Sequence, residues 1–78
     1  MGNLTNWRDV DVWNMETGTL VSTMPAQRAL LAEYKATGGI AGHVLMDPAG
    51  FENTPEDIER LCEVGPAVDE IDWTGFAD

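Results

Sequence analysis

The fold is decided by the stretch DVDVWNMETGTLVST, residues 9–23. In its first half polar and apolar side chains alternate, so that Val10 and Val12 share one face and Trp13 lies on the other, which is typical of a strand. A turn ending in Gly18 follows, and glycine tolerates the positive φ that a tight turn requires. The remainder returns as a second strand, so the stretch predicts a β-hairpin. Its expected strands are residues 9–15 and 19–23.

Two helices and two further strands are expected after the hairpin. Pro25 is placed for the first turn of a helix, with Thr23 or Met24 as the cap, and helix-forming residues follow until a pair of glycines. Thr54 and Pro55 mark a second helix start, and the acids after them complement the helix dipole. The expected elements are a helix over 25–37, a strand over 40–46, a turn over 47–50, a helix over 54–64 and a strand over 68–73.

Helical spacing predicts which side chains of the two helices face the core. The expected inward residues are Ala26, Leu30, Leu31 and Tyr34 in the first helix and Ile58, Leu61 and Cys62 in the second. Arg28 and Lys35 of the first helix are expected to face water.

A chain of 78 residues forms a single small domain, and its 44% of hydrophobic residues is close to the usual globular value. The element order β-β-α-β-α-β predicts a small α+β fold. The simplest packing is an antiparallel or mixed sheet with both helices on one face. That packing leaves the other sheet face open to solvent or to a partner. Residues 1–8 are expected to form an N-terminal arm and residues 74–78 a loose tail.

Side chains with catalytic or ligating chemistry are scarce. His43 and Cys62 are the single histidine and the single cysteine, so neither a disulfide nor a zinc site can form within the chain. The glycines of residues 38–42 follow a helix and enter a strand, whereas phosphate-binding loops run from strand to helix. We therefore expect a protein that is not an enzyme and that holds neither a metal nor a cofactor. The alternative is a small enzyme that uses His43 and Cys62.

Nothing in the sequence points to a membrane or to secretion. No apolar run approaches the roughly 20 residues that a membrane span needs. The first residues have neither the cationic start nor the apolar segment of a signal peptide. We expect a cytoplasmic protein.

Negative charge is concentrated in the last part of the chain. Residues 47–78 carry ten acids and one base, Arg60, whereas residues 1–46 carry four acids and three bases. Such a field repels nucleic acid and attracts basic protein surfaces, and tryptophan beside charge, as at Trp73, is typical of interface anchors. The expected partner-binding residues are Glu52, Glu56, Asp57, Glu59, Glu63, Glu70, Asp72 and Trp73. The alternative is an acidic face that only keeps the domain solvated.

This profile resembles small phage-encoded inhibitor proteins, above all the anti-CRISPR proteins and other DNA mimics. The resemblance rests on size, on the acidic bias of residues 47–78 and on the lack of a catalytic motif. In such proteins carboxylates occupy a lysine- and arginine-lined nucleic-acid channel of a CRISPR effector or another DNA-binding enzyme. The resemblance implies that role for Glu52, Glu56, Glu59, Glu63, Glu70 and Asp72.

The leading hypothesis is a non-enzymatic inhibitor that binds a basic, nucleic-acid-handling protein through its C-terminal acidic surface. The alternative is an assembly module whose open sheet face, with Trp13, pairs with a second copy or with a larger subunit. Binding by the first mechanism weakens as salt rises, whereas binding by the second tolerates salt.

Overall fold

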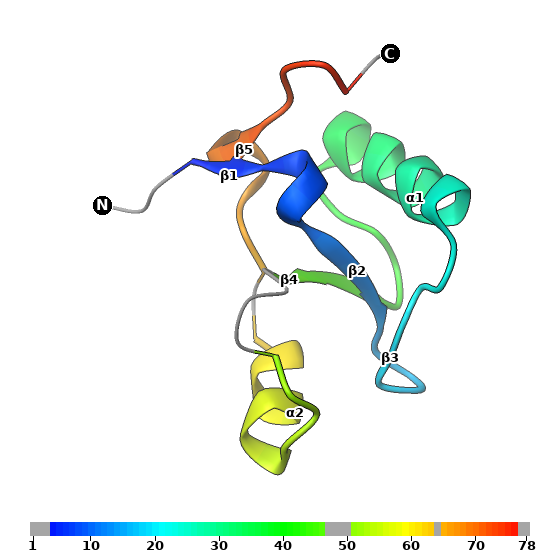
Figure 1. Cartoon of the computed structure of the whole chain (residues 1–78), viewed down its shortest axis with the longest axis vertical. Helices are drawn as coiled ribbons and strands as arrows, with labels where there is room; N and C mark the ends of the chain where they lie inside the picture. Colours follow the sequence, from blue (N-terminus) through cyan, green and yellow to red (C-terminus); the bar gives the residue numbers. More distant parts are fainter. Residues whose placement is uncertain (1–3, 47–50, 64, 77–78) are drawn as a thin grey trace.

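The computed structural model describes residues 4–46, 51–63 and 65–76 (Figure 1). Its elements are β1 (Thr5–Asn6), η1 (Trp7–Asp9), β2 (Asp11–Asn14), β3 (Thr19–Leu20), α1 (Met24–Thr37), β4 (His43–Met46), α2 (Pro55–Leu61), η2 (Val68–Glu70) and β5 (Ile71–Asp72), where η marks a 3₁₀ helix. The described residues confirm the expected small α+β fold. The turn expected over residues 47–50 lies outside them. No helix in the described part of the chain has the length and apolar character needed to cross a membrane.

The predicted hairpin is confirmed as β2 and β3, which belong to a three-stranded sheet. The strand order is β3-β2-β4 with both pairs antiparallel, and Trp13 lies opposite both Leu20 and Val44. Gly18 closes the turn at a φ of 66°, and its N–H donates to the Asn14 carbonyl at 2.8 Å. β2 is therefore the central strand of this sheet.

The two helices cover opposite faces of this sheet, so the expectation that both lie on one face is wrong. Val12 and Leu45 are paired across β2 and β4, and they pack in one cluster with Leu31 of α1. Trp13 points to the other face, because successive strand residues alternate, and it packs in a second cluster with Leu61 of α2. Both faces of β2 and β4 are apolar, and each therefore needs a cover. Trp13 is only 8% exposed, so the open sheet face expected around it is replaced by a buried contact.

Residues 5–7 of the expected N-terminal arm form a paired strand and part of the core, whereas residues 1–3 lie outside the described residues. β1 pairs with β5 in a parallel two-stranded sheet that places Thr5 opposite Ile71. Trp7 is 5% exposed and packs edge-on against Phe76, with ring centroids 5.0 Å apart. Phe76 lies in the segment expected as a loose tail, yet it is buried. The two ends of the described chain close the main core together, and each segment is too short to reveal this by periodicity.

The strand expected over residues 68–73 is reduced to its second half. Val68–Glu70 forms η2, and the extended strand β5 is Ile71–Asp72. The Glu70 carboxylate accepts the N–H of Ala67 at 3.3 Å, a local bond that competes with strand pairing. Glu70 and Asp72 therefore do not share one strand face.

Both helices begin at threonines that the sequence marks as caps. The hydroxyl of Thr23 accepts a first-turn backbone N–H at 3.4 Å, and that of Thr54 does the same at 3.2 Å. α1 ends at Thr37 and is capped by Gly38, whose φ of 82° suits glycine. α2 ends at Leu61, and residue 64, at the predicted end of this helix, lies outside the described residues.

The buried face of α1 is the expected one at Leu30, Leu31 and Tyr34, which all pack in or against the main core, and it differs at the first turn. Leu31 is buried as predicted, but Gln27 rather than Ala26 accompanies it inside. The amide of Gln27 is satisfied there, because its Nε2 donates to a backbone carbonyl six residues earlier at 2.7 Å. Arg28, expected in water, is half-buried. Helical spacing alone does not predict that a polar residue such as Gln27 is buried, because its burial depends on a hydrogen-bond partner elsewhere in the fold.

Candidate functional site

Four exposed carboxylates in the α2 region form the acidic ridge, defined as Glu52, Glu56, Glu59 and Glu63. Positions 56, 59 and 63 have the three- and four-residue spacing that places side chains on one side of a helix. Glu63 lies just beyond α2, where its N–H donates to the Arg60 carbonyl at 3.1 Å and continues the helical turn. The ridge is thus carried by backbone that is held by hydrogen bonds.

Asp57, expected in the same binding set, is turned inward. It is 4% exposed, and its Oδ2 accepts the backbone N–H of Glu52 at 2.7 Å. Oδ1 lies 3.1 Å from Nη2 of Arg60. The bond from Glu52, followed by bonds from Thr54 and the charge of Arg60, lowers the pKa of Asp57 from its ordinary value of 3.8. Asp57 therefore fastens the start of α2 and is not accessible to a partner.

The ion pair with Asp57 balances the charge of Arg60. Arg60 is the single base of residues 47–78, so the acidic ridge has no other base in this part of the sequence to offset it. Ile58, expected inside, is 45% exposed on the same helix. α2 therefore exposes a row of carboxylates and, about 200° around the helix from Glu56, one apolar side chain.

The remaining expected binding residues lie at the other end of the molecule. Figure 1 places β5 at the upper end of the long axis and α2 at the lower end. Asp72 accepts the N–H of Thr74 at 3.0 Å, and bonds from the Thr74 side chain and backbone lower the Asp72 pKa. Trp73 is half-buried, and its Nε1 donates to the Val68 carbonyl at 3.0 Å. Glu70, Asp72 and Trp73 therefore do not form one surface with the acidic ridge.

The bases of residues 1–46 gather over aromatic rings. The guanidinium carbons of Arg28 and Arg8 lie 5.1 and 5.3 Å from the ring centre of Trp7. Nζ of Lys35 lies 5.4 Å from the ring centre of Trp73, which directly follows β5. Cations in this position are attracted by the negative faces of the rings. Arg8, Arg28 and Lys35 thus lie near β1 and β5, where Glu70 and Asp72 also lie, so this part of the molecule carries charges of both signs.

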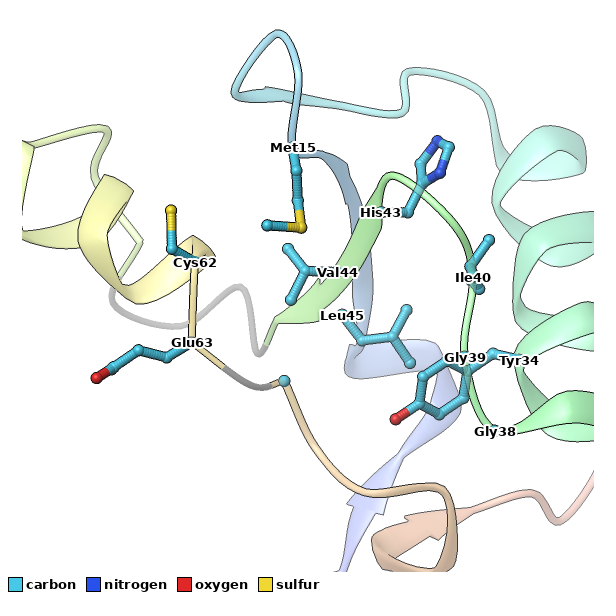
Figure 2. A pocket seen from close by; sticks show the side chains of 11 residues that line it. Met15, Tyr34, Gly38, Gly39, Ile40, His43, Val44, Leu45, Cys62 and Glu63 are labelled. Carbon is cyan, nitrogen blue, oxygen red and sulfur yellow. The ribbon is translucent and has the colours of Figure 1, made fainter.

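An open groove of about 290 Å³ lies beside β4 (Figure 2). Figure 2 shows Cys62 and Glu63 on one side of it, Tyr34 and Ile40 on the other, and Val44 of β4 between them. Lysine and arginine are absent from its lining within the described residues. The groove therefore combines an apolar floor with an acidic rim.

Glycines set the shape of this groove. At Gly38 and Gly39 an added side chain would meet no atom within 4 Å, so this wall stays open. Gly65 is the opposite case, because a Cβ there would overlap the backbone carbonyl of Leu45. The chain after α2 thus crosses the outer edge of β4 and shields it, although exposed strand edges are otherwise prone to pair with other chains.

Cys62 and His43 both line this groove, and Cys62 is exposed instead of inside the core as its helical position predicted. Nδ1 of His43 lies 2.9 Å from the carbonyl oxygen of Ala41. Three or more metal-ligating side chains do not come together anywhere among the described residues. The chemistry on offer in the groove is an accessible thiol, an imidazole held to the backbone and one carboxylate at the rim.

Sequence reasoning identified the glutamates of the ridge and missed the groove. The groove is built from four separate segments, and its lining includes Met15 from the hairpin turn and Ile40 from the loop before β4. Gly38 and Gly39 were interpreted as a helix end and excluded as a phosphate-binding loop, and nothing in the sequence connected them with a groove.

Comparisons with protein-family models, with curated proteins and with solved structures find no match for this chain. No residue therefore receives a role from a relative. The acidic ridge and the groove are characterised by their charge, exposure and geometry alone.

Proposed function

We propose that this chain is a non-enzymatic binding protein that places its acidic ridge against a basic, nucleic-acid-binding surface of another protein. The observation that carries the proposal is the row of exposed glutamates beside an Arg60 that is paired with the buried Asp57. The partner's surface would otherwise hold phosphates, so occupying it inhibits the partner. A CRISPR effector or a similar DNA-handling protein of the cytoplasm has the required chemistry.

Rigid presentation of the carboxylates supports this function. α2 is capped by Thr54 and anchored through Leu61, which is 2% exposed. Glu56 and Glu59 are separated by about 4.5 Å along a helix axis, given a rise of about 1.5 Å per residue. Duplex DNA carries one phosphate per about 3.4 Å on each strand. Fixed carboxylates at comparable spacing can contact several basic side chains without the entropy loss of ordering a flexible tail.

The distribution of charge also supports it. Arg8, Arg28 and Lys35 lie over the aromatic rings of Trp7 and Trp73, away from α2. The net charge of −10 and the ten acids of residues 47–78 attract a basic partner before contact, which accelerates association and makes it sensitive to salt.

Two matched charge variants test the proposal. The first carries Glu56→Lys, Glu59→Lys and Glu63→Lys. The second carries Asp9→Lys, Glu16→Lys and Glu33→Lys, which replace exposed acids outside the ridge. Both bring the formal net charge from −10 to −4, so they differ only in where the charge is changed. Circular dichroism establishes that each variant is folded.

Each immobilised variant is exposed to a cell lysate at about 50 mM salt and then eluted with about 500 mM salt or excess duplex DNA. We expect the original chain and the second variant to retain nucleic-acid-binding proteins that either eluent releases. The first variant should retain them at least about tenfold less, which corresponds to about 1.4 kcal/mol. Equal loss in both variants would mean that only net charge matters, and unchanged retention in the first would refute the role of the ridge.

A further inference from the structure

We infer that the groove beside β4 receives an arginine side chain of the basic partner, which makes it the anchoring pocket next to the acidic ridge. This inference rests on the proposed function and assigns one contact within it. The groove is continuous with the ridge, because Glu63 belongs to both.

The size and shape of the groove fit one side chain. Ligand pockets for cofactors and drug-sized molecules usually enclose about 300 to 1,000 Å³, and this groove of about 290 Å³ lies just below that range. It is open, and Gly38 and Gly39 leave one wall without side chains. A long, narrow side chain can therefore enter while its backbone remains outside.

The chemistry of the groove fits arginine in particular. Val44 and Ile40 provide apolar surface for an aliphatic stem, as Figure 2 shows. The weak hydration of a guanidinium lets it lie against the apolar rim at a lower cost than an ammonium group.

The charge of the groove excludes anions and favours a cation. Figure 2 shows the Glu63 side chain at the rim, directed away from Val44 and Tyr34, so in the proposed complex the guanidinium pairs with it outside the groove, on the Cys62 side. The described lining has no base to compete for this carboxylate. Hydrogen bonds between carboxylate and guanidinium are stronger than neutral ones and match in geometry.

The position of Cys62 provides a direct way to block the groove. Its thiol is exposed and it is the single cysteine, so N-ethylmaleimide modifies the groove alone. The matched control is the double variant Cys62→Ser and Ser22→Cys, in which the same label is attached to an exposed loop position outside the lining.

Binding is measured by NMR titration of the whole chain with Nα-acetyl-arginine amide. We expect shifts of the backbone amides of Gly38, Gly39 and Glu63, which are lost after labelling of Cys62 but kept in the labelled control. Glu63→Gln should raise the dissociation constant about twofold to fivefold, as expected for the loss of one exposed ion pair. Glu56→Gln, on the same ridge but outside the groove, should leave the dissociation constant unchanged. Absence of shifts, or equal shifts with Nα-acetyl-leucine amide, would overturn the assignment.

The capture experiment separates this inference from the proposed function. If both the labelled chain and the triple lysine variant lose the partner, ridge and groove act together. If only the triple variant loses it, the ridge is the binding surface and the groove assignment fails. If neither loses it, the proposed function itself fails, whatever the arginine amide does.

Discussion

The close approach between Gly65 and β4 makes a strong prediction about stability. A Cβ at position 65 would overlap the backbone carbonyl of Leu45, so Gly65→Ala requires the backbone to move. Gly39 provides a matched control in the same groove, because a Cβ there meets no atom within 4 Å and its φ lies outside the left-handed range. The two substitutions add the same methyl group, and they differ only in the space available.

The expected magnitudes have opposite signs. Overpacking that shifts backbone costs about 1–3 kcal/mol, so we expect Gly65→Ala to lower the free energy of unfolding by about 2 kcal/mol. For a domain of this size that corresponds to a fall in Tm on the order of 10 °C. Gly39→Ala should leave stability unchanged or raise it by up to about 1 kcal/mol, because alanine reduces the entropy of the unfolded chain.

Urea unfolding followed by tryptophan fluorescence measures both variants. The midpoint should move to lower urea for Gly65→Ala with an unchanged m-value, which indicates that the same surface is exposed on unfolding. Equal midpoints for the two variants would show that the chain does not cross β4 at Gly65 as described. The groove would then lack one of its boundaries.

Three further outcomes are expected. The pKa of Asp57 is lowered in the folded protein, so its contribution to stability is complete above the unfolded value of 3.8 and disappears as pH falls through the lower, folded pKa. Asp57→Asn should therefore flatten the loss of stability that urea unfolding measures as pH falls below 3.8. Leu61→Ala should cost about 2–5 kcal/mol, because the side chain is 2% exposed and its loss leaves a cavity under α2, and a change below about 1 kcal/mol in thermal unfolding would contradict that packing. The thiol of Cys62 should react with Ellman's reagent in the folded protein within about tenfold of its rate in urea, and a reaction that requires unfolding would place it back in the core.

The elements with strong local signals could be predicted from the sequence. The hairpin turn at Gly18 and the helix caps at Thr23 and Thr54 are determined by short-range backbone chemistry, and all three are confirmed. Packing could not be predicted in the same way. The rings of Trp7 and Phe76 are in contact although the two residues lie near opposite ends of the sequence, and neither lies in a periodic segment.

The candidate site could likewise be predicted only in part from the sequence. Exposure of Glu56, Glu59 and Glu63 follows from helical spacing once the helix is placed, but the identity of its buried face does not. An apolar Ile58 was expected inside, and the structure places the charged Asp57 there. Hydropathy ranks these two residues in the wrong order, because the buried carboxylate of Asp57 accepts a hydrogen bond from the Glu52 N–H and pairs with Arg60.

The inward Asp57 has a consequence for how α2 presents its surface. A helix of seven residues is too short to be stable alone, so it needs tertiary anchors. Asp57 and Leu61 lie four residues apart and supply both anchors from one narrow line of the helix. Because no wide apolar stripe is required, the rest of its circumference remains exposed, and Glu56, Ile58 and Glu59 can all reach a partner. A conventional amphipathic helix would also have buried Ile58, so the polar anchor at Asp57 leaves more of this short helix exposed.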